Sequence, residues 1–243
     1  MSLVYAFLAD IHGNHDALEA VLREVDKINP DATFCLGDIV GYGAEPKRCL
    51  DTIRERMIPC VAGNHDLAVV GTVAMDYFNP AAKESVEWTR DALSEEDVKH
   101  LAALPFLLKQ QGFTAAHGAF LNPEAFEYIL TINDAARSFE AFDEPFGFTA
   151  HSHVPMTFLM NGKDVSACMA ESLHMTRASR AIVNIGSVGQ PRDQNPMASF
   201  AIFEPEVRSV SIRRVAYDVE RAAEKILAAG LPGINAYRLL LGK

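Results

Sequence analysis

The sequence predicts an α/β fold, a four-layer αββα sandwich in which two mixed sheets pack on each other and helices cover the outside. Three observations favour this class. The first third of the chain alternates apolar, strand-like runs with amphipathic helical segments. A helical insertion around residues 79–104 follows, and short strands dominate from residue 106 onward. The length of 243 residues suits one domain that spans residues 1–243.

The first third of the chain shows the alternation most clearly. Residues 3–9 form an apolar run typical of a buried strand. Apolar residues then recur with helical spacing over residues 16–28, and Asn29-Pro30 ends this helix. The pattern continues through a second strand, a glycine-rich loop, a helix with proline in its first turn and a third strand, at residues 32–36, 37–43, 46–56 and 57–62.

Helix-start residues and short apolar runs predict the elements of the insertion and of the second half of the chain. Pro80 precedes one helix of the insertion, and Ser94 with Asp97 resembles a capping box at the start of the next. Beyond the insertion we expect strands at residues 106–110, 113–116, 147–150, 156–160, 181–185, 199–203 and 207–215. We also expect helices at residues 134–142, 219–229 and 234–240.

The composition narrows the class of protein. A hydrophobic content of 49% with 22% charged residues argues against disorder. No apolar run approaches the ~20 residues of a membrane-spanning helix, and the start lacks the regions of a signal peptide. The four cysteines form no CxxC pair, which favours reduced thiols and a cytoplasmic location. A net charge of −10 repels long polyanions, so we expect no bulk nucleic-acid binding and no membrane partner. The sequence does not predict an oligomeric state.

Polar side chains with metal-binding chemistry gather in short segments at predicted strand ends. The segments are Asp10-Ile11-His12, Gly37-Asp38, Gly63-Asn64-His65-Asp66, His117-Gly118 and His151-Ser152-His153. From His12 to Asp38 and from Asp38 to Asn64 the separation is 26 residues each time, about one βαβ unit. We therefore expect these side chains to meet at one edge of a sheet. Each segment alone is as typical of a hydrogen-bonded turn, but their combination and order indicate a metal site.

These segments resemble the blocks of the calcineurin-like metallophosphoesterase superfamily, which read D-x-H, G-D, G-N-H-D/E, H and G-H-x-H. The resemblance extends to about Pro155, and residues 184–192 resemble a small bacterial branch related to diadenosine tetraphosphatases. It implies the αββα fold, a catalytic His65 that does not bind metal, and Asp38 bridging two metal ions. It also implies a ligand set for each ion: Asp10, His12 and His153 for the first, and Asn64, His117 and His151 for the second.

Mixed carboxylate, amide and imidazole ligands suit two divalent ions such as Mn, Fe, Ni or Zn. Two such ions can hold a phosphoryl group and generate a bridging hydroxide that attacks phosphorus, while His65 donates a proton to the leaving oxygen. The expected function is hydrolysis of small phosphomonoesters or phosphodiesters. A dinucleoside polyphosphate hydrolase is an alternative, because the same ligands serve an anhydride. A non-catalytic scaffold on the same fold is a third possibility, and no expected ligand is replaced to favour it.

At three positions this chain has a residue that differs from the motifs of the superfamily. Protein phosphatases of this superfamily read G-D-x-V-D-R-G, where this chain has Gly41 and Tyr42 instead of the aspartate and the phosphate-binding arginine. Ala150 stands where the superfamily usually has glycine, and we expect only a small local adjustment there. Arg192 is the candidate replacement for the phosphate ligand, with a surface ion pair as the alternative. Asp66 is expected either to orient His65 or to cap the following helix.

Overall fold

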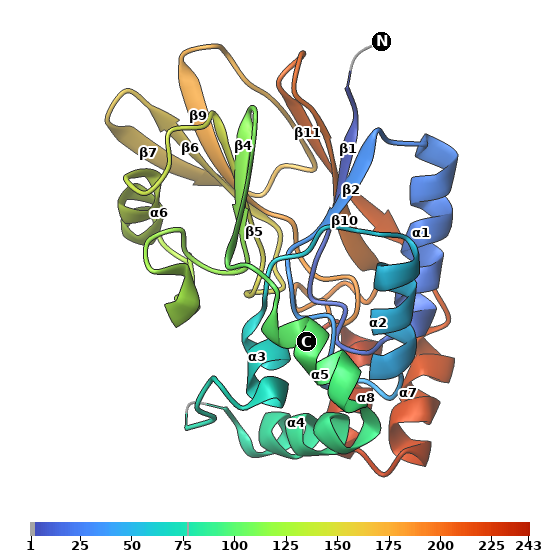
Figure 1. Cartoon of the computed structure of the whole chain (residues 1–243). Coiled ribbons are helices and arrows are strands. Elements are labelled where there is room, and N and C mark those ends of the chain that lie inside the picture. Colours follow the sequence, from blue (N-terminus) through green and yellow to red (C-terminus); the bar gives the residue numbers. More distant parts are fainter. Residues whose placement is uncertain (1–2, 77) are drawn as a thin grey trace.

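Two mixed β-sheets pack face to face in the computed structural model, which describes residues 3–76 and 78–243 (Figure 1). The strands of the first sheet run in the order β2 (Ala32–Cys35), β1 (Tyr5–Leu8), β10 (Ala198–Glu204), β11 (Ser209–Val215) and β8 (Ser172–His174). Those of the second run β3 (Leu107–Gln110), β4 (Phe113–Ala116), β5 (Phe146–Thr149), β9 (Ser179–Asn184), β6 (Met156–Asn161) and β7 (Asp164–Cys168). The pairs β1–β2, β4–β5 and β5–β9 are parallel.

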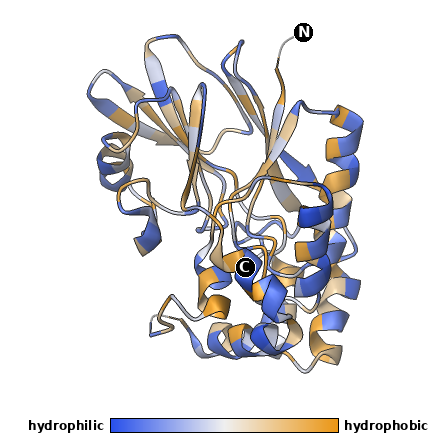
Figure 2. Cartoon of the chain, in the orientation of Figure 1, coloured by the Kyte–Doolittle hydropathy of each residue, from blue (hydrophilic) through white to orange (hydrophobic). Residues whose placement is uncertain are grey.

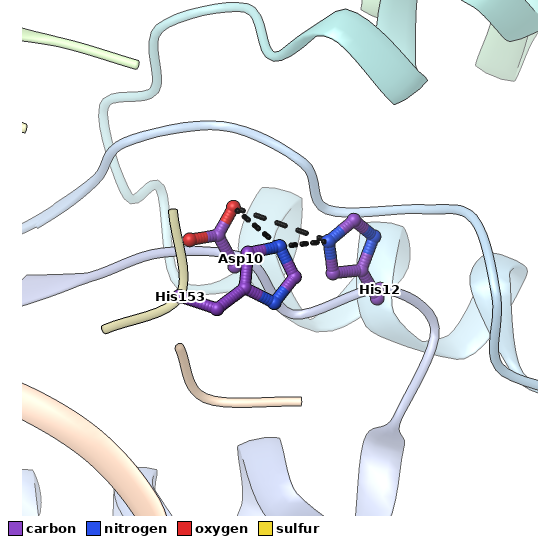
Figure 3. Close-up of side chains that lie close together, drawn as sticks. All are labelled: Asp10, His12 and His153. Carbon is purple, nitrogen blue, oxygen red and sulfur yellow. Dashed lines mark hydrogen bonds and ion pairs between the residues drawn. The ribbon is translucent and has the colours of Figure 1, made fainter. Parts of the chain in front are cut away.

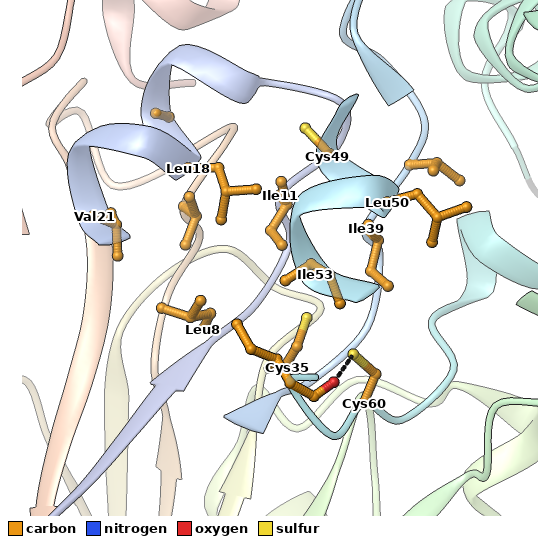
Figure 4. Packing of buried hydrophobic residues seen from close by; sticks show 14 of the residues in the cluster. Leu8, Ile11, Leu18, Val21, Cys35, Ile39, Cys49, Leu50, Ile53 and Cys60 are labelled. Carbon is orange, nitrogen blue, oxygen red and sulfur yellow. Dashed lines mark hydrogen bonds between the residues drawn. The ribbon is translucent and has the colours of Figure 1, made fainter. Parts of the chain in front are cut away.

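Alternate side chains of each central strand enter different cores, which explains why the strand runs are apolar throughout. Phe7 lies in the core between the sheets, where its ring stacks on Phe148 of the second sheet with centroids 4.1 Å apart. The neighbouring Ala6 and Leu8 face the helices instead. Figure 4 shows this outer core, in which Leu8 and Cys35 pack against apolar side chains of two helices.

Helices cover both outer faces. The first sheet carries α1 (His15–Ile28) and α2 (Pro46–Glu55), and the second carries α6 (Ile132–Phe139). The polar and apolar residues of these helices alternate along each ribbon, as amphipathic helices require (Figure 2). A further group lies beside one end of the sheets: α3 (Asn64–Val70), α4 (Pro80–Ala92), α5 (Glu95–Ala102), α7 (Val219–Ala228) and α8 (Gly233–Leu241). No helix in the described ranges is long and apolar enough to cross a membrane.

The predicted sandwich and the helical insertion are confirmed. The insertion consists of α4 and α5, and Ser94 and Asp97 do form a capping box at the start of α5. The predicted third strand at residues 57–62 is wrong, because the chain there makes only one bridge, between Cys60 and Cys35. Pro59 lacks an N–H for a ladder and Met57 has a φ of 52°, so the segment cannot continue as a strand.

Candidate metal centre

The loops that carry the predicted ligands follow parallel strands and meet at one end of the sandwich. Asp10 comes after β1 and Asp38 after β2, while His117 follows β4 and His151 follows β5. Backbone hydrogen bonds join the loops, from Asp10 N to Gly37 O (3.0 Å) and from Ala150 N to His117 O (2.9 Å). Five of these positions have positive φ angles between 50° and 68°, at Asp10, His12, Asp38, His151 and His153. Such backbone strain in non-glycine residues is concentrated at functional sites.

One cluster consists of Asp10, His12 and His153 (Figure 3). The Nε2 atoms of the two histidines lie 3.1 Å apart, and Asp10 Oδ1 is 3.9 Å from that of His12 and 3.6 Å from that of His153. All three side chains are buried. The sequence predicted this trio as the ligands of the first metal ion.

A second cluster surrounds His117. Its Nε2 atom lies 3.2 Å from Asn64 Oδ1 and 3.2 Å from His151 Nδ1. The ring of His151 is fixed from its other side by Tyr128, which stacks on it at a centroid distance of 3.9 Å. These three side chains are the trio predicted for the second metal ion.

Asp38 lies between the two clusters. Its Oδ2 atom is 3.5 Å from His12 Nε2 and 3.4 Å from His117 Nε2, so it faces one histidine of each. Its Oδ1 atom accepts a hydrogen bond from the backbone N–H of His65 at 2.8 Å. A carboxylate in this position can reach two cations at once.

Second partners fix the orientation of the histidine rings. His12, His117 and His153 each donate Nδ1–H to a backbone carbonyl, those of Val40 (3.2 Å), Leu36 (2.7 Å) and Gln190 (2.6 Å). Their Nε2 lone pairs therefore point inward, which is the usual arrangement of metal-ligating histidine.

The donors of the centre fit divalent cations. Among the described residues, the buried Asp10 Oδ1 and Asp38 Oδ2 atoms have no hydrogen-bond partner, and a cation would satisfy both. Burial raises the pKa of Asp10 to about 7. Burial alone would lower the pKa of His117, but the nearby negative charge of Asp38 raises that pKa to about 10. Both raised pKa values favour the protonated, more positive form of the side chain, because negative charge is concentrated in a buried site. Bound cations could supply that positive charge instead of protons.

Asp66 caps a helix, which is one of the two expected alternatives, and it also contacts the Asp38 loop, which the sequence did not predict. It caps α3 by accepting a hydrogen bond from Gly63 N at 3.0 Å, and it also accepts from the backbone N–H groups of Asp38, Ile39 and Val40 at 2.8–3.2 Å. It thereby ties the Asp38 loop to the loop of Asn64. Among the described residues no hydrogen bond joins Asp66 to the ring of His65, so the capping alternative holds.

Two glycines allow these loops to approach. A Cβ atom on Gly63 would lie 2.3 Å from Asp38 N, and one on Gly41 would lie 2.6 Å from His65 Nδ1. Gly41 also has a φ of 105°, a conformation that side chains rarely adopt. The sequence showed Gly41 only as a missing carboxylate, whereas the structure shows that the position holds no side chain beside His65.

His65 borders a cleft of about 400 Å³ beside the metal centre. Its ring packs against Tyr42 at 4.5 Å and Phe78 at 4.9 Å between centroids. Burial lowers the pKa of His65 to about 4, so the ring is neutral at pH 7. One of its nitrogens is also within 4.8 Å of donor atoms of His12 and Asp38, so its role as a non-ligand stays a prediction.

Arg192 lines the same cleft, and no ion pair holds it elsewhere among the described residues. Its Nη2 atom donates to Gln190 Oε1 at 2.9 Å and lies 3.5 Å from the Tyr42 hydroxyl. The alternative of a surface ion pair is therefore not realised. Further residues that line the cleft, among them Tyr128 and Arg238, were not predicted as site residues, because each lies in a segment without a recognisable motif.

Comparisons with known proteins agree with this geometry. A model of the calcineurin-like phosphoesterase family matches residues 3–168. Uncharacterized protein MJ0912 of Methanocaldococcus jannaschii is 34% identical over 248 residues, covering 98% of both chains. A crystal structure of a metallophosphoesterase from Sphaerobacter thermophilus superposes with a TM-score of 0.88 at 36% identity and covers 100% of both chains. The hypothetical protein PH1004 of Pyrococcus horikoshii shares the fold, with a TM-score of 0.80 and 21% identity over 99% of both chains.

Proposed function

The chain belongs to the calcineurin-like phosphoesterase family and is a metal-dependent hydrolase of phosphoric esters, and from that premise we propose that two divalent ions act in it on small phosphorylated molecules. The substrates that we propose are phosphomonoesters or phosphodiesters, and the ions Mn, Fe, Ni or Zn. We also propose that the enzyme works in the cytoplasm and binds neither bulk nucleic acid nor membranes.

The position of Asp38 Oδ2 is the observation that supports a pair of ions most directly. It lies at nearly equal distances from His12 and His117, which belong to different clusters. A single ion would leave one cluster of buried donors without a partner, at a cost in free energy. Two ions about 3.5–4 Å apart with a shared carboxylate would satisfy both clusters.

The residues around the centre divide the remaining work. When bound, the ions would polarise the phosphoryl group and activate a water molecule. Arg192, beside Tyr42 on the cleft wall, would hold a phosphoryl oxygen through its planar fork. His65 would face the leaving oxygen and donate a hydrogen bond or a proton to it. Phe78 and Tyr42 enclose His65 and limit its access to bulk water.

The test combines metal analysis with activity on a chromogenic phosphomonoester and a matched phosphodiester, each with Mn²⁺, Ni²⁺ and Zn²⁺. We expect about two ions per chain and metal-dependent hydrolysis of at least one substrate. Two bound ions without any hydrolysis would favour the scaffold alternative. Hydrolysis of neither ester but of a dinucleoside polyphosphate would favour the anhydride alternative. Tight binding of only one ion would contradict the dinuclear centre.

A further inference from the structure

A second arginine borders the cleft beside the metal centre. Arg192 lies next to the centre, because its backbone N–H donates to His153 O at 3.2 Å. Arg238 lies on α8 and lines the same cleft, together with Tyr42. Residues 192 and 238 both fall outside the region 3–168 that matches the family, so this wall belongs to the C-terminal part of the chain.

Neither guanidinium pairs with an Asp or Glu side chain among the described residues, although the chain carries a net charge of −10. Arg192 bonds to the neutral Gln190, and its buried Nε atom has no partner in the described part of the chain. Arg238 Nε donates to a main-chain oxygen of Lys243, the last residue of the sequence, at 2.7 Å, and its two Nη groups make no hydrogen bond to the described residues. Two half-buried guanidinium groups on one cleft that pair with no Asp or Glu repel each other, and an anionic ligand in the cleft would offset that repulsion.

The two arginines can reach one ligand, because both line the same cleft of about 400 Å³. In agreement with this, burial lowers the pKa of Arg238, and the positive charge of Arg192 lowers that pKa further. The helix that carries Arg238 is held in place, because Asn235 donates to Ser85 Oγ at 2.9 Å and to the carbonyl of Tyr42 at 3.5 Å. Arg238 follows Asn235 by three residues and so lies on the same side of α8. The wall is therefore positioned before any ligand arrives.

A phosphoryl group on the metal ligands would use Arg192, which lies beside His153. Arg238 is then left for a different anionic group on the same molecule. We propose that Arg238 forms a second anion subsite next to Arg192, and that the substrate carries a second phosphoryl group beside the one that is hydrolysed. This inference rests on the proposed function, because it assumes that a phosphoryl group binds at the metal centre.

Calorimetric titration of the metal-loaded protein tests the subsite without turnover. The probes are butylphosphonate and butane-1,4-bisphosphonate, which differ in the second phosphonate and cannot be hydrolysed. We expect the bisphosphonate to bind about tenfold more tightly, and Arg238→Gln to reduce this preference to about twofold or less. Arg23→Gln is the matched control, because Arg23 is exposed on α1, and it should keep the preference. A third probe with a carboxylate in place of the second phosphonate should bind less tightly than the bisphosphonate.

Equal binding of both phosphonates to the wild type would overturn the subsite, and so would an unchanged preference in Arg238→Gln. A carboxylate probe that binds as well as the bisphosphonate would contradict the second phosphoryl group. Should the Gln variant not fold, Arg238→Lys keeps the charge without the fork and should still reduce the preference; an unchanged preference there would count equally against the proposal. Failure of the proposed function is separate, because it would appear as metal-loaded protein that hydrolyses no ester whatever its binding preference.

Discussion

Asp38 uses its two carboxylate oxygens differently, one on the backbone of His65 and one toward His12 and His117. A carboxylate between two cations offsets their repulsion. We therefore expect Asp38→Ala to retain fewer than two ions per chain and to lose turnover. Metal analysis after gel filtration measures the first effect. Asp91→Ala, which removes an exposed carboxylate of α4, should retain both ions. Two tightly bound ions in Asp38→Ala would show that it does not bridge.

His65 allows a test that separates chemistry from metal binding. The hydrogen bond from His65 to Asp38 comes from the backbone N–H and not from the ring, so His65→Ala should keep the fold and the metal ions. We expect the rate to fall about 10²–10⁴-fold, with a larger loss for alkyl than for nitrophenyl leaving groups. Stopped assays with both substrates measure this, and Phe78→Leu, which keeps an apolar neighbour, is the control. Equal losses for both leaving groups would indicate phosphate binding, and loss of metal would make His65 a ligand.

The pKa of His65 predicts how its contribution to the rate depends on pH. Burial lowers it to about 4, so the ring is neutral throughout the neutral range and its positive form appears only in acid. The metal ions would lower this pKa further, since they are also cations. We therefore expect the ratio of wild-type to His65→Ala rates to be the same at about pH 6 and about pH 8. A ratio that falls steeply as the pH rises would instead show that a protonated ring with a much higher pKa does the work.

At the scale of elements, α3 depends on the helical insertion. This short helix brings Asn64 and His65 to the centre, and its last carbonyls, of Ala68 and Val69, accept hydrogen bonds from Arg90 of α4 at 2.7 and 2.9 Å. Arg90→Ala should lower the free energy of unfolding by about 1 kcal/mol, because it removes partners from helix-terminal carbonyls.

Urea unfolding of Arg90→Ala measures this effect, and Arg137→Ala, which removes an exposed ion pair of α6, is the control. A change no larger than in the control would show that water satisfies the carbonyls of α3 as well as Arg90 does.

The elements that could be predicted from the sequence are those whose pattern reflects burial. Strand β1 and helix α1 are buried on faces that their apolar residues mark directly. Strand β7 was missed because most of its residues are exposed and show no apolar run. Helix α3 was expected only as the helix that Asp66 could cap, and its bounds were not predicted, because its first residues coincide with a metal-ligand motif and it has only 7 residues. The third strand was wrong because Pro59 outweighs the apolar residues around it.

Some features of the candidate site could also be predicted from the sequence, and others could not. That Asp10, Asp38 and His117 would lie together followed from their places at strand ends, and the structure brings them together. The partners that orient them could not be predicted, because backbone carbonyls leave no trace in the sequence. The anchoring by Asp66 and the place of Arg238 depend on packing between segments that are far apart in the chain. The number and the identity of the metal ions stay predictions.

At the scale of the whole molecule, the centre joins the two sheets. Asp10 and Asp38 follow strands of the first sheet, whereas His117 and His153 follow strands of the second. The first cluster draws on both sheets, and Asp38 connects the first sheet to His117 of the second cluster. Bound ions would therefore link the sheets at one end of the sandwich. The core between the sheets, around Phe7 and Phe148, already holds them together without metal.

Removal of the ions should consequently lower stability without unfolding the protein. A ligand that binds only the folded state stabilises it by about 1.4 kcal/mol for each tenfold rise in its free concentration above the dissociation constant. We expect chelation to lower the Tm, added Mn²⁺ to restore it, and the Tm to keep rising with the logarithm of the free metal concentration. Circular dichroism melts over a range of buffered metal concentrations measure this slope.

Asp38→Ala should show a shallower slope than Asp91→Ala, because it loses the carboxylate that both clusters share. A Tm that does not respond to chelation or to metal would mean that the ions do not link the sheets, and that the unpartnered oxygens of Asp10 and Asp38 are satisfied by protons instead.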